Sequence, residues 1–224
     1  SKELYPVGFR QVDGNGTVRS KVVAHYLLEK MRLAGAQKAF IVLRDGKWDI
    51  PKYFGDGSML DMNLAYLMMG LPYGTPYTAD QAVPFLQDCL VAFGFPDILF
   101  GPDDAYCQLL KRQAATHADI VLGLFPADRP DTMDMVDVDE DGWVRSLVIK
   151  PPHTTLRYAW ILAVWTPVFT HYQHEFIKKH LKAIDGFSGA QQEELAVGQV
   201  IQAAIQDGMR VQAVMFPDHS YLDI

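Results

Sequence analysis

The sequence has few of the features that mark secreted, membrane-spanning or nucleic-acid-binding proteins. It holds only two cysteines, Cys89 and Cys107, too few for a disulfide framework or a cysteine-based metal site. No apolar run reaches transmembrane length, and the N-terminus does not have the pattern of a signal peptide. Positive charge is in deficit, with 20 Lys and Arg against 27 Asp and Glu, which argues against binding to nucleic acid or membrane surfaces. We therefore expect a cytoplasmic protein with reduced, buried thiols.

The composition is that of a globular protein. Hydrophobic residues make up 49% of the 224 positions and charged residues 21%, so the chain can bury one large core. We expect a single domain over residues 1–224. Because the net charge is −7, an anionic substrate would need local positive charge from a few lysines or from helix N-termini.

Residues 90–100 are the stretch around which the chain is organised. They are apolar or glycine except for Asp97, and such a short run is typical of a strand buried on both faces. Ligands of open α/β sheets bind beyond the carboxyl ends of strands, where Asp97 would lie. Two interpretations stay open for Asp97: a residue that handles a metal or a phosphate, and a solvated aspartate in a turn.

Helical and apolar segments alternate along the rest of the chain. Helical spacing is expected at residues 20–33, from 78 onward, and at 105–115, 169–184 and 191–206. Strands are expected at residues 39–43, 63–68, 120–125, 158–165 and 209–216, and a hairpin at 135–149; residues 47–49 and 54–57 are expected in loops. This order predicts an α/β fold, a three-layer α/β/α Rossmann-like architecture with a mixed, mainly parallel sheet.

Three motifs could bind a metal, but each has a structural interpretation that we favour. Residues 137–142 resemble the start of a calcium loop, yet Val148 stands at its twelfth position, where a glutamate is required. The Asp137-Val138-Asp139 sequence could instead be a glycosyltransferase metal motif. His171 and His174 share a helix face without a signalled third ligand. We expect a hairpin turn and a partly exposed helix face.

Several motifs in order resemble those of the sugar-1-phosphate nucleotidyltransferases, in particular the glucose-1-phosphate thymidylyltransferase and uridylyltransferase branch. Residues 1–7 look like the proline- and lysine-rich end of the signature loop of the family, and residues 33–36 and 54–58 follow as in the family. Gly74 looks like the glycine of the nucleotide-binding loop, at the expected distance from Asp97. Residues 148–151, 194–195 and 221–224 resemble the Glu-Lys-Pro, Glu-Leu and Trp-x-Asp-x-Gly elements.

The resemblance implies a nucleotide-diphospho-sugar transferase fold and an enzyme that joins a sugar 1-phosphate to a nucleoside triphosphate, releasing pyrophosphate. It implies that Asp97 and Asp223 hold magnesium (Mg²⁺), that Lys2 neutralises nucleotide or pyrophosphate charge, and that Lys150 holds the attacking phosphate. The implied catalytic residues are thus Lys2, Asp97 and Asp223. The implied substrate-binding residues are Met69, Gly74, Thr75, Lys150 and Glu194.

The chain also departs from the family pattern. We expect the glycine-rich loop with its arginine, and the first strand that carries it, to lie upstream of Ser1. Other departures are Met69 in place of a pyrimidine-reading glutamine, Ile149 in place of a glutamate, Leu162 in place of a glycine, and Gln199 in place of an aspartate. Two alternatives therefore remain, a noncatalytic nucleotide-sugar-binding or regulatory protein and a glycosyltransferase of similar topology. The base, the sugar and a homo-oligomeric state are left open.

Overall fold

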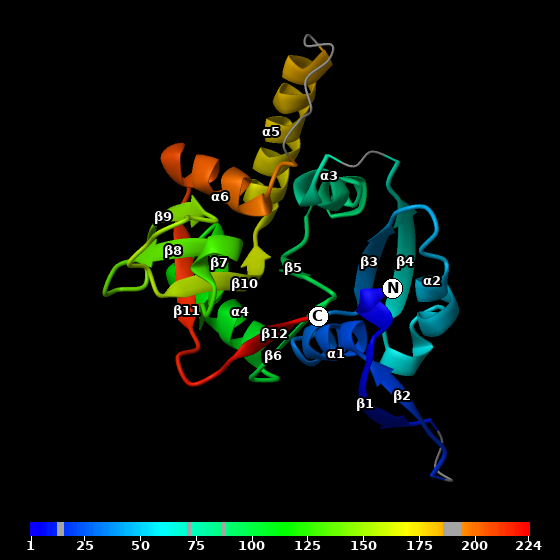
Figure 1. Cartoon of the computed structure of the whole chain (residues 1–224). Helices are drawn as coiled ribbons and strands as arrows, with labels where there is room; N and C mark the ends of the chain where they lie inside the picture. Colours follow the sequence, from blue (N-terminus) through cyan, green and yellow to red (C-terminus); the bar gives the residue numbers. More distant parts are fainter. Residues whose placement is uncertain (13–15, 71–72, 87, 186–193) are drawn as a thin grey trace.

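The structure is a computed structural model, and it describes residues 1–12, 16–70, 73–86, 88–185 and 194–224 (Figure 1). The helices are α1 (Val23–Leu33), α2 (Asp49–Phe54), α3 (Thr75–Asp80), α4 (Ala105–Thr116), α5 (Pro167–Asp185) and α6 (Val197–Gln206). The first strands are β1 (Pro6–Gln11), β2 (Val18–Val22), β3 (Lys38–Leu43), β4 (Asn63–Met68), β5 (Val91–Gly94) and β6 (Ile98–Phe100). The later strands are β7 (Ile120–Pro126), β8 (Asp134–Val138), β9 (Val144–Ile149), β10 (Tyr158–Trp165), β11 (Val211–Met215) and β12 (Tyr221–Asp223).

A six-stranded sheet forms the centre of the molecule. Its order is β11-β7-β10-β8-β9, and β5 also pairs with β10. β10 runs antiparallel to β5, β7 and β8, whereas β11 runs parallel to β7. A separate parallel pair, β3–β4, and two antiparallel pairs, β1–β2 and β6–β12, complete the pairing. The expected α/β fold with a mixed sheet is confirmed, but fewer strands pair in parallel than the alternation of helices and strands predicts.

Helices cover both faces of the central sheet, and successive apolar side chains of β7 pack alternately against one helical layer and the other. Val121 and Phe125 belong to a core cluster with α1 and α4, whereas Leu122 and Leu124 belong to a second cluster with α5 and α6. Successive side chains of a strand point to opposite faces, so a run that is apolar throughout needs a helical layer on each side. The three-layer α/β/α architecture follows (Figure 1).

The N-terminal segment differs from the expectation. Residues 20–22 belong to β2 of a β1–β2 hairpin, and the helix begins only at Val23. Residues 49–54, in part expected as loop, form the short helix α2, which ends at Gly55 with a φ of 58°. Pairing with β1 supplies hydrogen bonds to residues 18–22, so helical spacing alone does not decide the structure of that segment.

The strand predicted at residues 90–100 is interrupted. β5 ends at Gly94, a turn contains Asp97, and β6 begins at Ile98. The residues of β5 are half-buried rather than buried on both faces, and β5 pairs antiparallel with β10. The strand was expected to be parallel, and this prediction was wrong, since direction depends on a partner some 70 residues away in the chain. No helix among the described residues is long and apolar enough to cross a membrane.

Candidate active site

Asp97 and Asp223 are brought together by the pairing of β6 with β12. Asp223 is the register partner of Ile98, the residue after Asp97. The Ile224 N–H donates to the Asp97 carbonyl oxygen at 3.1 Å. Both aspartates line the same cavity. The antiparallel ladder therefore joins two carboxylates that lie far apart in the sequence.

Lys2 lies against this pair of carboxylates. A short 3₁₀ helix, Lys2–Leu4, precedes β1, and Lys2 forms an ion pair with Asp97. The hydrogen bond to Asp97, together with the charges of Asp97 and Asp223, raises the pKa of the Lys2 amine, against the opposing effect of burial. Lys2 thus stays charged at neutral pH and compensates part of the negative charge of the two aspartates.

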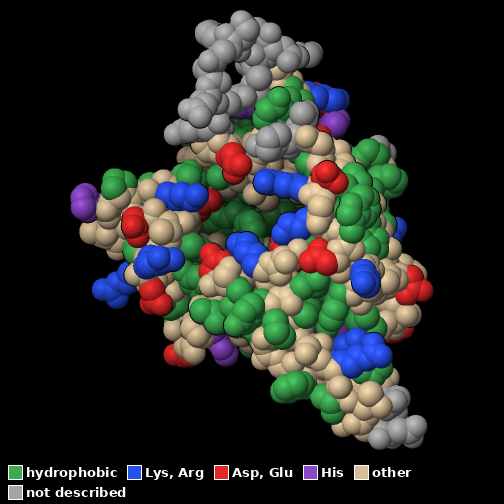
Figure 2. Space-filling view, turned by 45° about the vertical axis from the view of Figure 1, so that its right-hand side comes forward, with side chains coloured by type: hydrophobic (Ala, Val, Ile, Leu, Met, Phe, Trp, Pro, Cys, Tyr) green, Lys and Arg blue, Asp and Glu red, His purple; other side chains and the backbone are tan. Residues whose placement is uncertain are grey.

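The cavity has a volume of about 220 Å³ and lies where β6, β8, β9, β12 and the start of α6 converge. Its polar lining includes Thr75, Asp97, Asp134, Lys150 and Asp223. Phe95, Met133 and Trp160 form much of the apolar lining. Figure 2 shows a hollow on this side of the molecule with an apolar floor and with lysine, arginine and acidic side chains around its rim. Such a mixture of apolar walls and a few charged groups is typical of a small-molecule site.

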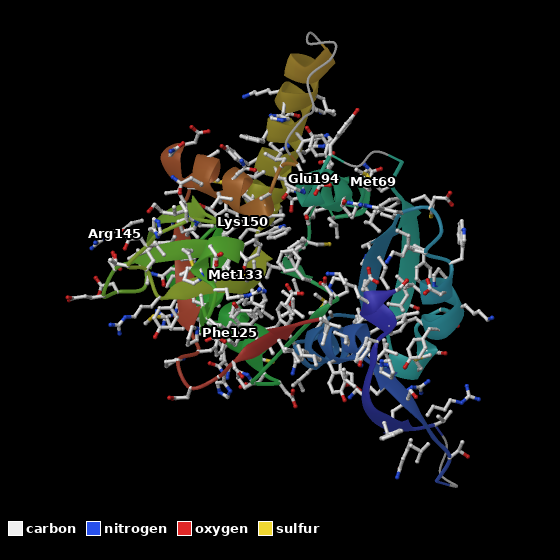
Figure 3. The ribbon with its side chains drawn as sticks, in the orientation of Figure 1. Met69, Phe125, Met133, Arg145, Lys150 and Glu194 are labelled. Atoms are coloured by element: carbon white, nitrogen blue, oxygen red, sulfur yellow. The ribbon has the colours of Figure 1, made fainter. Side chains whose placement is uncertain are left out.

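Lys150 reaches the cavity from the residue after β9. Its φ is 42°, in the left-handed region that residues other than glycine rarely adopt, and its N–H donates to the Met133 carbonyl at 3.1 Å. Backbone strain of this kind persists only where surrounding contacts enforce it, and it is frequent at binding sites. Figure 3 labels Lys150 and Met133 near each other, whereas Arg145 of β9 points outward at the far edge.

Gly74 and Thr75 connect the predicted nucleotide-binding loop to the cavity. Gly74 has a φ of 109°, and a Cβ there would lie 2.2 Å from the Leu195 carbonyl oxygen. The Leu195 N–H donates to the Tyr73 carbonyl at 3.1 Å, so the loop and the Glu-Leu element lie directly against each other. Only glycine fits this close approach. Thr75 follows at the start of α3 and lines the cavity.

Glu194 and Met69, both labelled in Figure 3, are absent from the cavity lining. Glu194 is exposed beside Leu195, and Met69 is buried in the core cluster that contains Tyr77. Two other departures from the family pattern also have structural partners. Leu162 is fully buried in the core, and the Gln199 side chain accepts a hydrogen bond from the Ala196 N–H at 2.7 Å, which caps α6.

The sequence prediction missed Asp134 and Trp160, which line the cavity beside Lys150. Trp160 Nε1 lies 3.4 Å from Asp134 Oδ2, and burial raises the pKa of the Asp134 carboxyl group. The signal in the sequence was weak, because the hairpin was expected to begin only at residue 135 and because Trp160 resembles one more apolar residue of a buried strand. The available clue was that a hairpin with this turn pairs the charged Asp134 with Ile149, the residue before Lys150.

The weaker metal motifs have the structural roles that we favoured. The Asp139 side chain accepts hydrogen bonds from the N–H groups of Asp141 and Trp143, at 3.0 and 2.8 Å, as in a hairpin turn. His174 Nδ1 lies 2.8 Å from Asp80 Oδ1. Across the described ranges, no group of three or more His, Cys, Asp or Glu side chains is placed to hold a metal ion. Cys89 and Cys107 are free and half-buried.

A second cavity, of about 500 Å³, lies beside the β1–β2 hairpin. Its polar lining is Arg10, Arg19, Ser20, Lys52 and Tyr53. It contains no carboxylate and none of the residues predicted for the site. The smaller cavity is therefore the candidate active site, since carboxylates and a lysine converge there.

A mixed sheet is covered by helices on both faces, and beside it lies a cavity lined by Asp97, Asp223 and Lys150, with Lys2 paired to Asp97. This arrangement defines an α/β protein suited to handling phosphate groups. The chain belongs to the nucleotidyl transferase family, whose model matches residues 2–224.

Individual relatives agree with this family. The chain is 24% identical over 199 residues to the low-salt glycan biosynthesis nucleotidyltransferase Agl11 of Haloferax volcanii, and 26% identical over 200 residues to a glucose-1-phosphate thymidylyltransferase of Streptomyces antibioticus. Each match covers 88% of this chain and 52% of the relative, so the chain spans about half the length of these relatives. A UDP-glucose pyrophosphorylase solved with UDP-glucose has the same fold, with a TM-score of 0.71 at 14% identity over 91% of this chain and 81% of that one.

Proposed function

We propose that this chain joins a sugar 1-phosphate to a nucleoside triphosphate, giving a nucleotide-sugar and pyrophosphate. The observation that carries the proposal is that Asp97, Asp223 and Lys150 line one cavity, while Lys2 forms an ion pair with Asp97. Membership of the nucleotidyl transferase family supports it.

The chemistry needs positioning and charge compensation, because one anionic phosphate must attack another in line. Lys150 would hold the attacking sugar phosphate, and Lys2 would neutralise the nucleotide phosphates or the departing pyrophosphate. Gly74 and Thr75 would border the nucleotide. Glu194 and Met69 would contribute to substrate binding from positions outside the cavity lining. No nucleophilic side chain is required, since the substrate phosphate is itself the nucleophile.

Asp97 and Asp223 would hold Mg²⁺. Magnesium prefers one or two carboxylates together with phosphate oxygens and water, and this pair of aspartates fits that preference without a third protein ligand. The ion pair of the Lys2 ammonium with Asp97 supports the proposal, since it places a positive charge against this carboxylate. The ion would supply charge neutralisation for the phosphates of both substrates.

The test is pyrophosphate release from a panel of four nucleoside triphosphates against common hexose 1-phosphates. We expect release only when a triphosphate, a sugar 1-phosphate and magnesium are all present. Release that does not depend on the sugar 1-phosphate would indicate a different reaction and would contradict the proposal.

The second candidate is a noncatalytic nucleotide-sugar-binding or regulatory protein. It is favoured by Met69, which is buried in the core where a base-reading glutamine was expected, and by the apolar Ile149 before Lys150. Tight calorimetric binding of a nucleotide-sugar, without turnover of any pair in the panel, would select this candidate.

We also propose that a strand preceding Ser1 completes the domain. Within the described residues, β3 pairs only with β4, and β5 pairs only with β10, so each strand offers a free edge (Figure 1). Under this proposal, a chain extended upstream of Ser1 by such a strand should show higher thermal stability and faster pyrophosphate release than residues 1–224 alone.

We further propose that the protein acts in the cytoplasm, because the two free cysteines support a reducing compartment.

A further inference from the structure

Asp134 is a carboxylate of the cavity that the chemistry proposed above does not use. It is the first residue of β8 and lines the cavity together with Lys150 and Trp160. The side chain is half-buried, and burial raises the pKa of its carboxyl group. A buried carboxylate costs free energy unless enough donors surround it. Its presence therefore points to a role other than folding stability.

The protein supplies this carboxylate with few hydrogen-bond donors. Trp160 Nε1 donates to Asp134 Oδ2 over 3.4 Å, which is long for a hydrogen bond of this type. The backbone N–H of Gly198, near the start of α6, also favours the ionised form. A carboxylate can accept about four hydrogen bonds, so acceptor capacity remains for a ligand in the cavity.

The position of the carboxylate is fixed by close packing against Gly198. A Cβ on Gly198 would lie 2.2 Å from Asp134 Oδ2 and 2.8 Å from Ile149 Cδ1. Asp134 and Ile149 are register partners of β8 and β9, so their side chains share one face. The side chains at positions 134 and 149 therefore both reach toward Gly198. In this chain the carboxylate is at position 134, and position 149 is apolar.

The surroundings of Asp134 suit a ligand that has a hydroxylated ring and a phosphate group. Lys150, which follows Ile149, provides a cation in the same lining. Trp160 and Phe95, whose ring centroids lie 5.5 Å apart, provide an aromatic wall. Apolar walls with a few placed polar groups orient a ligand, and buried polar groups then discriminate against analogues that leave them unpaired.

We propose that Asp134 selects the sugar of the substrate by accepting a hydrogen bond from one ring hydroxyl group, while the sugar phosphate lies at Lys150 and the ring packs against Trp160. This inference rests on the proposed function and adds the feature of the substrate that is recognised. A sugar 1-phosphate that lacks this hydroxyl group leaves the carboxylate unpaired inside the cavity.

The test compares a hexose 1-phosphate that the wild-type protein uses with its monodeoxy analogues. For the wild type, we expect one analogue to lose about 100-fold or more in kcat/KM relative to the parent, because a site built around a hydroxyl group rejects its absence. In D134A, activity on the parent falls, and the ratio between parent and that analogue approaches one. This ratio isolates the contact, since a general loss of folding or activity cancels from it.

Two further variants separate recognition from support of α6. D134N keeps an oxygen acceptor for the Gly198 N–H, so its thermal stability should match the wild type while calorimetric affinity for the parent sugar 1-phosphate falls. D134A/I149E returns a carboxylate to the same face and should restore part of the discrimination. A ratio in D134A equal to that of the wild type would overturn the proposal, as would a preference of the wild type for an amino sugar 1-phosphate over the parent, which would identify an ammonium group as the partner.

The outcomes also distinguish this inference from the proposed function. If the wild type neither binds nor turns over any sugar 1-phosphate, the proposed function fails and the role of Asp134 fails with it. If the wild type is active but D134A keeps its discrimination, only the role of Asp134 is wrong.

Discussion

Asp223 lies beside Asp97 because β12 pairs with β6, and the N–H of the next residue, Ile224, donates to the Asp97 carbonyl oxygen at 3.1 Å. A backbone ladder therefore holds the two carboxylates in register, without help from side-chain contacts between them. Lys2 reaches the same place from the other end of the chain.

The first prediction concerns this pair of carboxylates. D97N and D223N should each lower pyrophosphate release by about 100-fold or more, because each removes one of the charges proposed to hold magnesium. D218N is the matched control, since Asp218 is exposed in the segment between β11 and β12 and the charge change is the same. An equal loss in D218N would show that net charge, and not the site, is responsible.

Lys150 is predicted to contact the sugar phosphate. K150M should weaken calorimetric binding of a sugar 1-phosphate by about 10- to 100-fold, since a hydrogen bond to a charged group contributes about 1.5–3 kcal/mol. Binding of the nucleoside triphosphate should change much less. K111M, on the exposed surface of α4, is the control and should leave both affinities unchanged. Equal losses for both ligands in K150M would contradict this role.

Gly74 is predicted to be required for the contact between its loop and Leu195. G208A tests backbone strain alone, because Gly208 has a φ of 88° and nothing lies within 4 Å of its added Cβ; it should cost about 1–2 kcal/mol. G74A adds a clash at 2.2 Å with the Leu195 carbonyl oxygen and should cost about 1–3 kcal/mol more. Urea unfolding of both variants measures the difference. Equal costs would mean that the loop simply moves away from Leu195.

His25 is predicted to make stability depend on pH. It is 2% exposed and stacks on Phe54 with ring centroids 6.1 Å apart, and burial lowers its pKa below 6.5 despite the neighbouring Glu29. The folded state thus prefers the neutral imidazole. Its contribution to the free energy of unfolding is complete above about pH 6.5 and is lost as the pH falls toward the lower folded-state pKa.

Urea unfolding between pH 7.5 and 5 should therefore show a smaller loss of stability in H25Q than in the wild type. H171Q removes an exposed histidine of α5 and serves as the control, with a profile like that of the wild type. A wild-type profile in H25Q would mean that other groups dominate over this range.

The sequence determined those elements whose pattern is local. The strand at residues 158–165 has the predicted bounds, and the hairpin of β8 and β9 forms with its turn at Asp141 and Gly142, as these residues indicate. The order of the motifs identified the family and drew attention to Asp97, Asp223 and Lys150, because spacing along a chain is itself a sequence property.

Only the tertiary structure decided which strands pair and which side chains meet. β5 and β10 could each be read as buried strands, but their antiparallel direction depends on contacts between residues about 70 positions apart. The surroundings of Asp134 depend on Trp160 of β10, on Lys150 just after β9 and on Gly198 of α6. Hydrophobic periodicity reports which face of an element is buried, and it carries no information about the partner across that face. For this reason the sequence indicated the two aspartates, and the fold was needed to show the carboxylate that lies between Trp160 and Gly198.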